Sequence, residues 1–301
     1  MRTLLYALRR LLLVPVAAVI VSLIVFFAVH ALTGDPCLRE GRQSDTFHEH
    51  CLHQLGLDRP LAVQYLAFVR TIAQGLVSPT LIAGAANSIK LGFFALLITV
   101  GVGVGLGAMA AVHQDTWRDR LATSGSLLAV STPNFVLASL LILATVTWMY
   151  QLTGGLLYED IGWGKVEQVP VPALALGLPP AGIVARITRT AMLDVMRQDF
   201  VVAARAKGVG ERAVMTRHAL RNALLPVASV LGPLATTIIT GSLVIENVFG
   251  IPGLGKPLVG SLFGRNYVVT VEIMTYYSIL VGVANVLADV TYSLLDPRVR
   301  Y

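Results

Sequence analysis

The chain alternates six long apolar stretches with shorter polar segments. A helix needs roughly 20 residues to cross a hydrocarbon layer roughly 30 Å thick. The third stretch exceeds one crossing, so we expect it to include a short approach, and the fourth is interrupted by Gly177, Pro179 and Pro180. We predict an all-α integral membrane protein with transmembrane helices over residues 11–32, 89–112, 121–150, 171–187, 224–245 and 271–294.

The composition favours a membrane protein over a soluble one. Of the 301 residues, 55% are hydrophobic and 13% are charged, whereas a soluble domain carries about 25% charged residues. Such a chain cannot cover a globular surface with polar groups, which excludes a cytosolic enzyme. It is also too apolar to be disordered.

Lysine and arginine are distributed unevenly between the two sides of the predicted membrane. With the N-terminus inside, fifteen lie in inner segments and seven in outer ones. Cytoplasmic segments carry the excess of these residues, so we expect both termini in the cytoplasm. The net charge of +6 then reflects topology, and no nucleic-acid partner is expected. The basic start also resembles a secretory signal, but the apolar run exceeds the usual span of about 7 to 15 residues, so we expect it to be retained.

The longest outer segment, residues 33–87, holds the two cysteines of the chain, Cys37 and Cys51. On this topology they face an oxidising compartment, so a disulfide is expected. Two free thiols are the alternative. A metal site is a third interpretation, because three histidines lie near Cys51, but their spacing matches no regular metal motif, and we expect no metal. These are His48, His50 and His53.

Four glycines recur at every second position in the second stretch. They form two overlapping pairs four residues apart, which is the spacing that lets helices approach closely in lipid. We expect them to support helix packing. The residues are Gly101, Gly103, Gly105 and Gly107.

Three polar residues near the ends of the last two spans, Glu246, Asn285 and Asp289, allow two interpretations. Ionisable groups in a membrane by default mark a pathway or a partner. Their positions near span ends also suit capping or helix pairing, where water or headgroups reach them. Both interpretations stay open on the sequence.

Residues 250–256 match the first seven positions of a phosphate-binding loop, but the eighth position is Pro257 instead of the Ser or Thr that holds magnesium. The chain is therefore not expected to bind nucleotide. No arrangement of nucleophile, base and orienting group is recognisable, so we do not expect an enzyme.

The inner segment 186–222 is the most basic part of the chain. Asp199 is placed to cap a short helix over 200–207, and Gly208 is placed to end it. A second helical stretch over 211–222 precedes Pro226, at which we expect the next span to begin. Neither helix is apolar enough to insert, so the pair suits docking to a partner protein.

The sequences DFVVAARAKG (199–208) and RHALRNALLP (217–226) resemble the coupling loop of the dipeptide, oligopeptide and nickel ABC transporter permeases. The resemblance covers nearly the whole chain: LTGDP at 32–36, TGSLVIENVF at 240–249, PGLG at 252–255 and DPR at 296–298 fall in the same order. Two departures are Val202, where the general signature has Glu, and Asn266, where the family often has Asp.

The resemblance implies a type I ABC importer permease fold in the bacterial inner membrane. The organisation would be a cytoplasmic N-terminus and first span (1–32), an outer loop (33–87) and a permease core (88–301) with a coupling loop (190–222). It assigns coupling to Asp199, Ala203, Ala204, Arg205, Ala206, Lys207, Gly208, Arg217, His218, Arg221, Asn222 and Pro226.

The resemblance also implies partners. They are a homologous second permease subunit, two cytoplasmic ATPase subunits that hold ATP and Mg²⁺, and an extracytoplasmic solute-binding protein. The cargo would be peptides, with oligopeptides favoured over dipeptides and nickel. The alternative function is a self-contained channel or ion-coupled transporter. Such proteins place polar groups at the midplane and often show inverted repeats, neither of which is recognisable here.

Overall fold

The computed structural model describes residues 2–32, 37, 45–74, 79–154, 163–165 and 168–295, and all regular structure in them is helical. A bilayer offers the backbone no water, so apolar segments fold as helices whose hydrogen bonds are internal. Within the described residues, six helices are long and apolar enough to cross a membrane. They are α1 (Arg2–Leu32), α4 (Pro79–Val112), α6 (Asn134–Thr153), α7 (Pro170–Met196), α10 (Arg221–Val248) and α12 (Tyr267–Leu295).

The shorter helices connect these spans. They are α2 (Asp45–Leu55), α3 (Leu61–Ala73), α5 (Trp117–Ser131), α8 (Asp199–Ala206), α9 (Glu211–Ala213), the π-helix η3 (Val214–Leu220) and α11 (Gly255–Phe263). Helix α4 begins ten residues before the predicted span, inside the segment that we assigned to the outer loop. The motif residues 33–36 and 296–298 lie outside the described residues.

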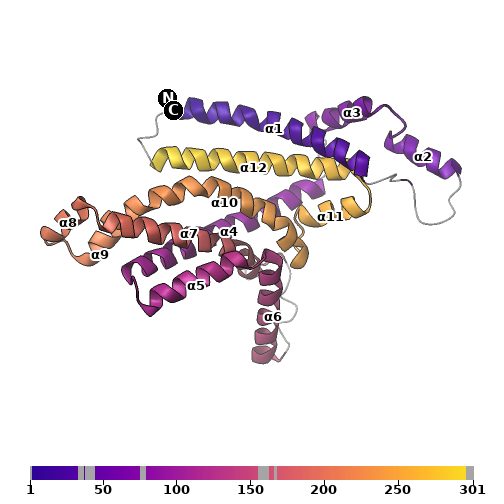
Figure 1. Cartoon of the computed structure of the whole chain (residues 1–301). Coiled ribbons are helices and arrows are strands. Elements are labelled where there is room, and N and C mark those ends of the chain that lie inside the picture. The colour runs from indigo at the N-terminus through magenta and orange to yellow at the C-terminus, as the bar shows by residue number, and fades with distance from the viewer. Residues whose placement is uncertain are drawn as a thin grey trace.

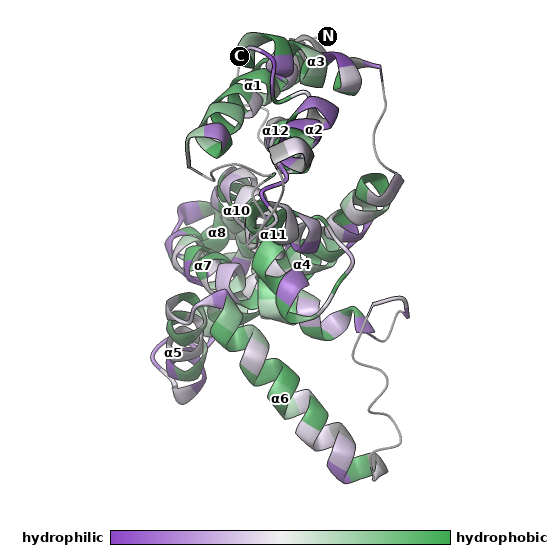
Figure 2. Cartoon of the chain, turned by 90° about the vertical axis from the view of Figure 1, so that its right-hand side faces the viewer, coloured by the Kyte–Doolittle hydropathy of each residue, from purple (hydrophilic) through white to green (hydrophobic). Residues whose placement is uncertain are grey.

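The third predicted stretch consists of two helices, and the short approach expected within it is α5. The stretch is divided into α5 and α6 at Thr132 and Pro133, and Figure 1 shows α6 turned across the direction of α5. Proline disfavours the helical conformation at the residue before it, and Thr132 is extended, with ψ 124°. Of these two, only α6 is apolar and long enough to cross a membrane by itself. It contacts α7 and α10 and projects from the bundle (Figure 2).

The other long helices pack side by side. α1, α12, α10 and α7 follow one another in space, with α4 and α5 against α7 (Figure 1). The contact between α4 and α7 is the most extensive in the described chain. At its centre, the hydroxyl of Thr99 donates to the carbonyl of Gly177 at 2.9 Å, which satisfies a buried polar group between the two helices.

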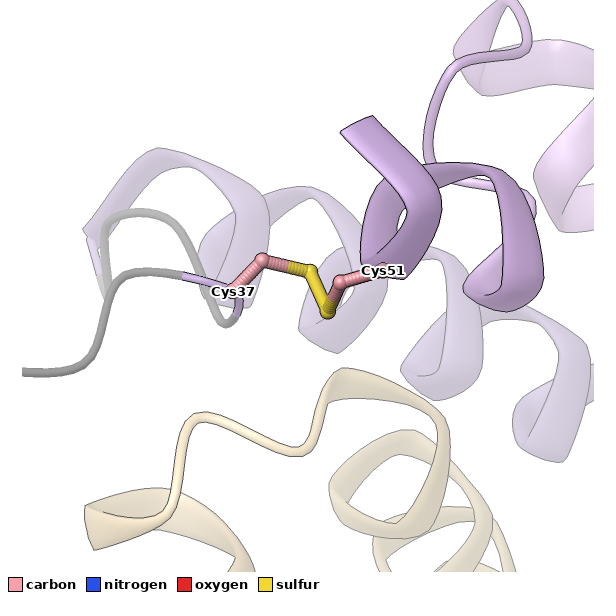
Figure 3. The surroundings of a disulfide bond; sticks show 2 residues. All are labelled: Cys37 and Cys51. Carbon is pink, nitrogen blue, oxygen red and sulfur yellow. A yellow bond between two sulfur atoms is a disulfide. The ribbon is translucent and has the colours of Figure 1, made fainter. Parts of the chain in front are cut away.

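Cys37 and Cys51 form a disulfide that ties the segment before α2 to that helix (Figure 3). The sulfur atoms are 2.05 Å apart and the Cα atoms 5.9 Å apart. Because Cys51 is in a disulfide, it has no thiolate to bind a metal ion. The interpretation of this segment as a metal site therefore loses one of its ligands. In the part of the chain that the structure describes, no three acidic, histidine or cysteine side chains are grouped to hold a metal ion.

Candidate coupling site

The segment between α7 and α10 begins with α8. Its N-cap is Gln198, which has extended backbone (φ −79°, ψ 149°) and makes no side-chain capping bond. The prediction that Asp199 caps this helix is therefore wrong by one position. Asp199 lies in the first turn, where a negative charge still interacts favourably with the helix dipole.

Gly208 ends α8, as the sequence predicts. Its φ of +79° lies in the left-handed region, where a side chain would strain the backbone. The N–H of Gly208 donates to the carbonyl of Arg205 at 2.9 Å, and that of Val209 donates to the carbonyl of Ala204 at 3.2 Å. These two bonds form a Schellman motif, which satisfies the last carbonyls of the helix and turns the chain sharply.

One face of α8 is buried in an apolar cluster. Val201 is completely buried and Ala204 nearly so. Because tight apolar packing transmits displacement, a force on α8 reaches three spans together. The neighbouring residues of the cluster are Ala111 of α4, Met192 and Val195 of α7, Val214 and Ala219 of η3, and Ala223 of α10.

The opposite face of α8 is exposed and apolar. Phe200 is 41% exposed and Val202 is 55% exposed, with Ala203 and Ala206 exposed beside them. An exposed apolar patch with a polar rim marks an interaction site. The rim here is basic, with exposed side chains at Lys207, Arg212, Arg217 and Arg221.

Arg205 and Glu211 close the loop between α8 and α9. Nε of Arg205 donates to Oε2 of Glu211 at 3.1 Å, and Nη2 donates to Oε1 at 2.7 Å. The hydrogen bond to this carboxylate raises the pKa of the Arg205 guanidinium. Arg205 thus links α8 to α9 across Gly208 within the chain itself.

The second predicted helix does not end before the next span. α9, η3 and α10 are continuous, so the prediction that Pro226 begins a new helix is wrong. Pro226 and Pro233 lie inside α10. Inside η3, the carbonyl of His218 accepts a hydrogen bond from the amide of Asn222 at 2.7 Å. A π-helix is rare and is frequently found at functional sites.

The structure shows an ion pair between α5 and α7 that the sequence did not predict. Nε and Nη2 of Arg189 on α7 donate to the two carboxylate oxygens of Asp119 on α5, at 2.6 and 2.7 Å. The hydrogen bond from Arg189 lowers the pKa of Asp119 to about 2. The predicted span ended at residue 187, which left Arg189 in the basic inner segment, and the acid lies 70 residues away, so no local signal indicated the pair.

Residues 103–301 match the model of the family described as binding-protein-dependent transport system inner membrane component, and residues 3–93 match the N-terminal model of such membrane components. The chain belongs to this family. It is a multi-pass inner-membrane permease subunit of an ABC importer.

Relatives of known name match the permease over nearly its whole length. The dipeptide transport system permease protein DppB of Bacillus subtilis (strain 168) is 33% identical over 307 residues, covering 98% of this chain and 97% of its own. The oligopeptide transport system permease protein OppB of Salmonella typhimurium (strain LT2) is 33% identical over 301 residues, covering 96% of each.

The fold is also similar to a solved structure. A chain of an amino acid ABC transporter, crystallised with histidines, superposes with a TM-score of 0.52 at 19% identity, covering 77% of the permease and 98% of that chain. At this identity the likeness shows the fold alone. It agrees with the all-helical permease architecture predicted from the sequence.

The four glycines of α4 divide into two pairs. A Cβ at Gly103 would lie 2.6 Å from Cβ of Val184, and one at Gly107 would meet the carbonyl of Ala185, so both allow α7 to approach. Gly101 and Gly105 face open space, so the described residues show no packing role for them.

The polar residues of the last two spans pair helices. Oε2 of Glu246, which is completely buried, accepts the N–H of Gly255 at 2.6 Å. Oδ1 of Asn285 accepts the hydroxyl hydrogen of Thr236 at 3.0 Å, and Arg10 on α1 contacts Asp289 on α12 at 2.6 Å. Of the two interpretations left open by the sequence, these contacts favour capping and pairing over a pathway.

Proposed function

We propose that the permease imports peptides, with oligopeptides favoured over dipeptides and nickel. Relatives named for dipeptide and oligopeptide transport match almost the entire chain, which supports a peptide cargo. The proposed partners are a homologous second permease subunit, two cytoplasmic ATPase subunits that hold ATP and Mg²⁺, and an extracytoplasmic solute-binding protein. Both termini and the coupling loop 190–222 face the cytoplasm, and the disulfide loop faces outward.

The observation that carries this proposal is the two-sided construction of α8. Its exposed apolar face, with Phe200 and Val202, offers a surface for an ATPase subunit. Its buried face contacts α4, α7 and α10 through one cluster. Docking on one side and packing on the other make α8 a mechanical link between the ATPase and the spans.

ATP drives the conformational cycle through a difference in binding energy between two states of the permease. ATP shifts the permease toward one conformation only if the ATP-bound ATPase pair binds that conformation better than the other. Closure of the ATPase pair displaces the two α8 helices of the permease pair toward each other. The cluster under α8 passes this displacement to the inner ends of three spans, which alternate between inward-open and outward-open states.

Phe200→Asp in the reconstituted complex tests the docking surface. A charge in the apolar contact is expected to lower peptide-stimulated ATP hydrolysis by about tenfold or more, the scale of a central interface residue. Copurification of the ATPase subunits should fall with it. The matched control is Gln114→Asp in the exposed turn between α4 and α5, which should leave both readouts near wild type. Equal hydrolysis in the two variants would refute docking through α8.

The cargo is tested with the same vesicles and the associated binding protein. Radiolabelled oligopeptides, dipeptides and nickel are offered in turn, and ATP-dependent accumulation is measured. Accumulation of nickel alone would overturn the peptide assignment. Transport by this chain in liposomes without ATPase subunits would instead favour the channel or ion-coupled alternative.

A further inference from the structure

The segment between α1 and α4 contains two helices with opposite exteriors. Among the described side chains of α2, those that are exposed are all polar, as a surface in water requires: Thr46, Glu49, His50, His53 and Gln54. In the first two turns of α3, the exposed side chains are all apolar. We call them the outward face of α3, and they are Leu61, Ala62, Val63, Leu66 and Ala67. The two helices therefore suit different surroundings.

The polar side chains in these two turns of α3, Gln64 and Tyr65, make their hydrogen bonds inside the protein. Nε2 of Gln64 donates to the carbonyls of Leu57 and Arg59 at 3.1 and 2.7 Å. Oε1 of Gln64 lies 3.1 Å from Nε2 of His30 on α1. A surface helix in water has its polar side outward and its apolar side inward. The first two turns of α3 have the reverse arrangement, which is typical of a helix in lipid, where polar side chains bond across to other helices.

Tyr65 shows how far α3 lies along α1. Its hydroxyl is 2.8 Å from Oγ of Ser22 and donates to the carbonyl of Val19 at 3.3 Å. The apolar span of α1 runs from Leu8 to Ala31. At a rise of 1.5 Å per residue, Ser22 and Val19 lie about 14 and 18 Å from the end of this span. Half of the hydrocarbon layer is about 15 Å thick, so the hydroxyl of Tyr65 reaches the middle of the membrane.

Apolar packing holds α3 at the same level. Phe68 of α3 packs against Phe26 of α1 and Val271 of α12, and all three side chains are buried. Phe26 and Val271 both belong to apolar spans. Figure 1 shows α3 beside α1, whereas α2 lies beyond the end of α1. The helix with the apolar exterior is therefore beside a membrane span, and the helix with the polar exterior is outside it.

We propose that α3 lies within the lipid bilayer and that its outward face contacts the acyl chains of phospholipids. The leaflet is the one at the C-terminal end of α1, which is the outer leaflet in the proposed topology. The proposal concerns neither cargo nor coupling, and it goes beyond the proposed function. It divides the segment between α1 and α4 into an embedded helix, α3, and a helix in water, α2.

The last turn of α3 carries two exposed polar residues, Arg70 and Thr71. The hydroxyl of Thr71 donates to the carbonyl of Ala67 at 3.0 Å, so it needs no water. A long arginine side chain keeps its methylene groups in the apolar layer while its guanidinium reaches the interface. There, Arg70 suits the phosphate of a lipid headgroup, whose charge is opposite.

Spin labels on single cysteines test the surroundings of the outward face. The two native cysteines are bonded to each other, so an introduced cysteine is the chain's single free thiol. The test position is Leu66→Cys, where the leucine is 66% exposed. The control is Gln54→Cys, which is exposed on α2. The full complex, with partner subunits free of cysteine, is placed in vesicles of phosphatidylethanolamine and phosphatidylglycerol.

Collision rates of the label with two quenchers are then measured by electron paramagnetic resonance. Oxygen enters hydrocarbon readily, whereas the charged complex chromium oxalate is excluded from it. The ratio of oxygen to chromium oxalate collisions should be about tenfold higher for Leu66→Cys than for Gln54→Cys, since a charged quencher pays a large transfer cost in lipid.

Two results would overturn the proposal. Equal ratios at the two positions would place the outward face of α3 in water, where a solute-binding protein could reach it. Slow collisions with both quenchers at Leu66→Cys would show that another subunit covers the face. The measurement needs neither peptide nor ATP, so its outcome is independent of the tests of cargo and coupling.

A pair of substitutions at the same position gives a second measurement. Leu66→Asp places a charge among acyl chains, which is costly, whereas Leu66→Met keeps an apolar side chain of similar size. In vesicles, the complex with Leu66→Asp should melt several degrees below the complex with Leu66→Met, or yield less folded protein. Gln54→Asp is the control for a new charge on α2 and should melt like the wild type. Equal melting temperatures and yields for Leu66→Asp and Leu66→Met would contradict contact with lipid.

Discussion

The turn after α10 and the loop before it, which are outer and inner in the proposed topology, are built in opposite ways. In the outer turn, Ile251 and Leu254 are completely buried. The N–H of Gly255 donates to the buried carboxyl of Glu246, and the N–H of Leu254 donates to the hydroxyl of Ser88 at 3.1 Å. In the inner loop, Val201 and Ala204 are buried, whereas Phe200 and Val202 are exposed. The ion pair of this loop, between Arg205 and Glu211, is also exposed.

The difference separates two uses of a connection between spans. The outer turn completes the core, since its backbone donors are satisfied by side chains of α4 and α10. The inner loop keeps an unpaired apolar face on α8 and a basic rim. A fixed outer turn and an exposed apolar face on the inner loop suit the proposed permease, which is driven by an ATPase at the inner side, and each end can be perturbed separately.

The largest expected effect is at the outer end. Glu246→Ala leaves the buried N–H of Gly255 without its acceptor and opens a cavity, which should cost about 4 kcal/mol. We expect little folded permease in membranes, measured by fluorescence size-exclusion chromatography of a tagged chain. Asn247→Ala, at the adjacent exposed position, is the control and should fold normally. Equal yields of the two variants would show that the outer turn is not fixed by Glu246.

A matched pair on α8 distinguishes packing from docking at the inner end. Ala204→Asp places a carboxylate in the apolar cluster and should destabilise the permease by about 3 kcal/mol. Ala203→Asp changes the exposed neighbour and should leave the melting temperature unchanged while lowering peptide-stimulated ATP hydrolysis. If both variants lost stability equally, the two faces of α8 would not have separate roles.

The π-helix offers a smaller perturbation. Deleting Thr216 removes the extra residue that a π-turn accommodates, and α8 would rotate by about 100° relative to α10. Transport should be lost while most of the fold is kept, because the deletion lies outside the contacts between the membrane-spanning helices. Thr216→Ala is the control for loss of the side chain. Normal transport after the deletion would mean that the register of α10 does not matter for coupling.

The sequence predicted the spans and the coupling segment, because apolar length and a local motif identify them. It did not predict the break at Pro133, since proline also occurs inside α7 and α10 without ending them. The pairs Arg189–Asp119 and Glu246–Gly255 depend on how separate segments fold together. Gly103 and Gly105 are equivalent in the sequence, and only the position of α7 separates them.

The smallest expected effect concerns two glycines that flank the same turn. Gly208 has φ +79°, whereas Gly210 precedes α9 with φ −60°, and neither position would bring a Cβ within 4 Å of another group. Alanine at Gly208 should therefore cost about 1 kcal/mol through backbone strain alone, while alanine at Gly210 should be neutral or slightly stabilising. Because the Schellman bonds set the angle between α8 and α9, Gly208→Ala should also reduce the peptide stimulation of ATP hydrolysis more than its basal rate. The melting temperature and the ratio of stimulated to basal hydrolysis, measured for both variants, test this. A loss in Gly210→Ala that matched the loss in Gly208→Ala would show that the inner loop needs flexibility at this turn and not its left-handed backbone.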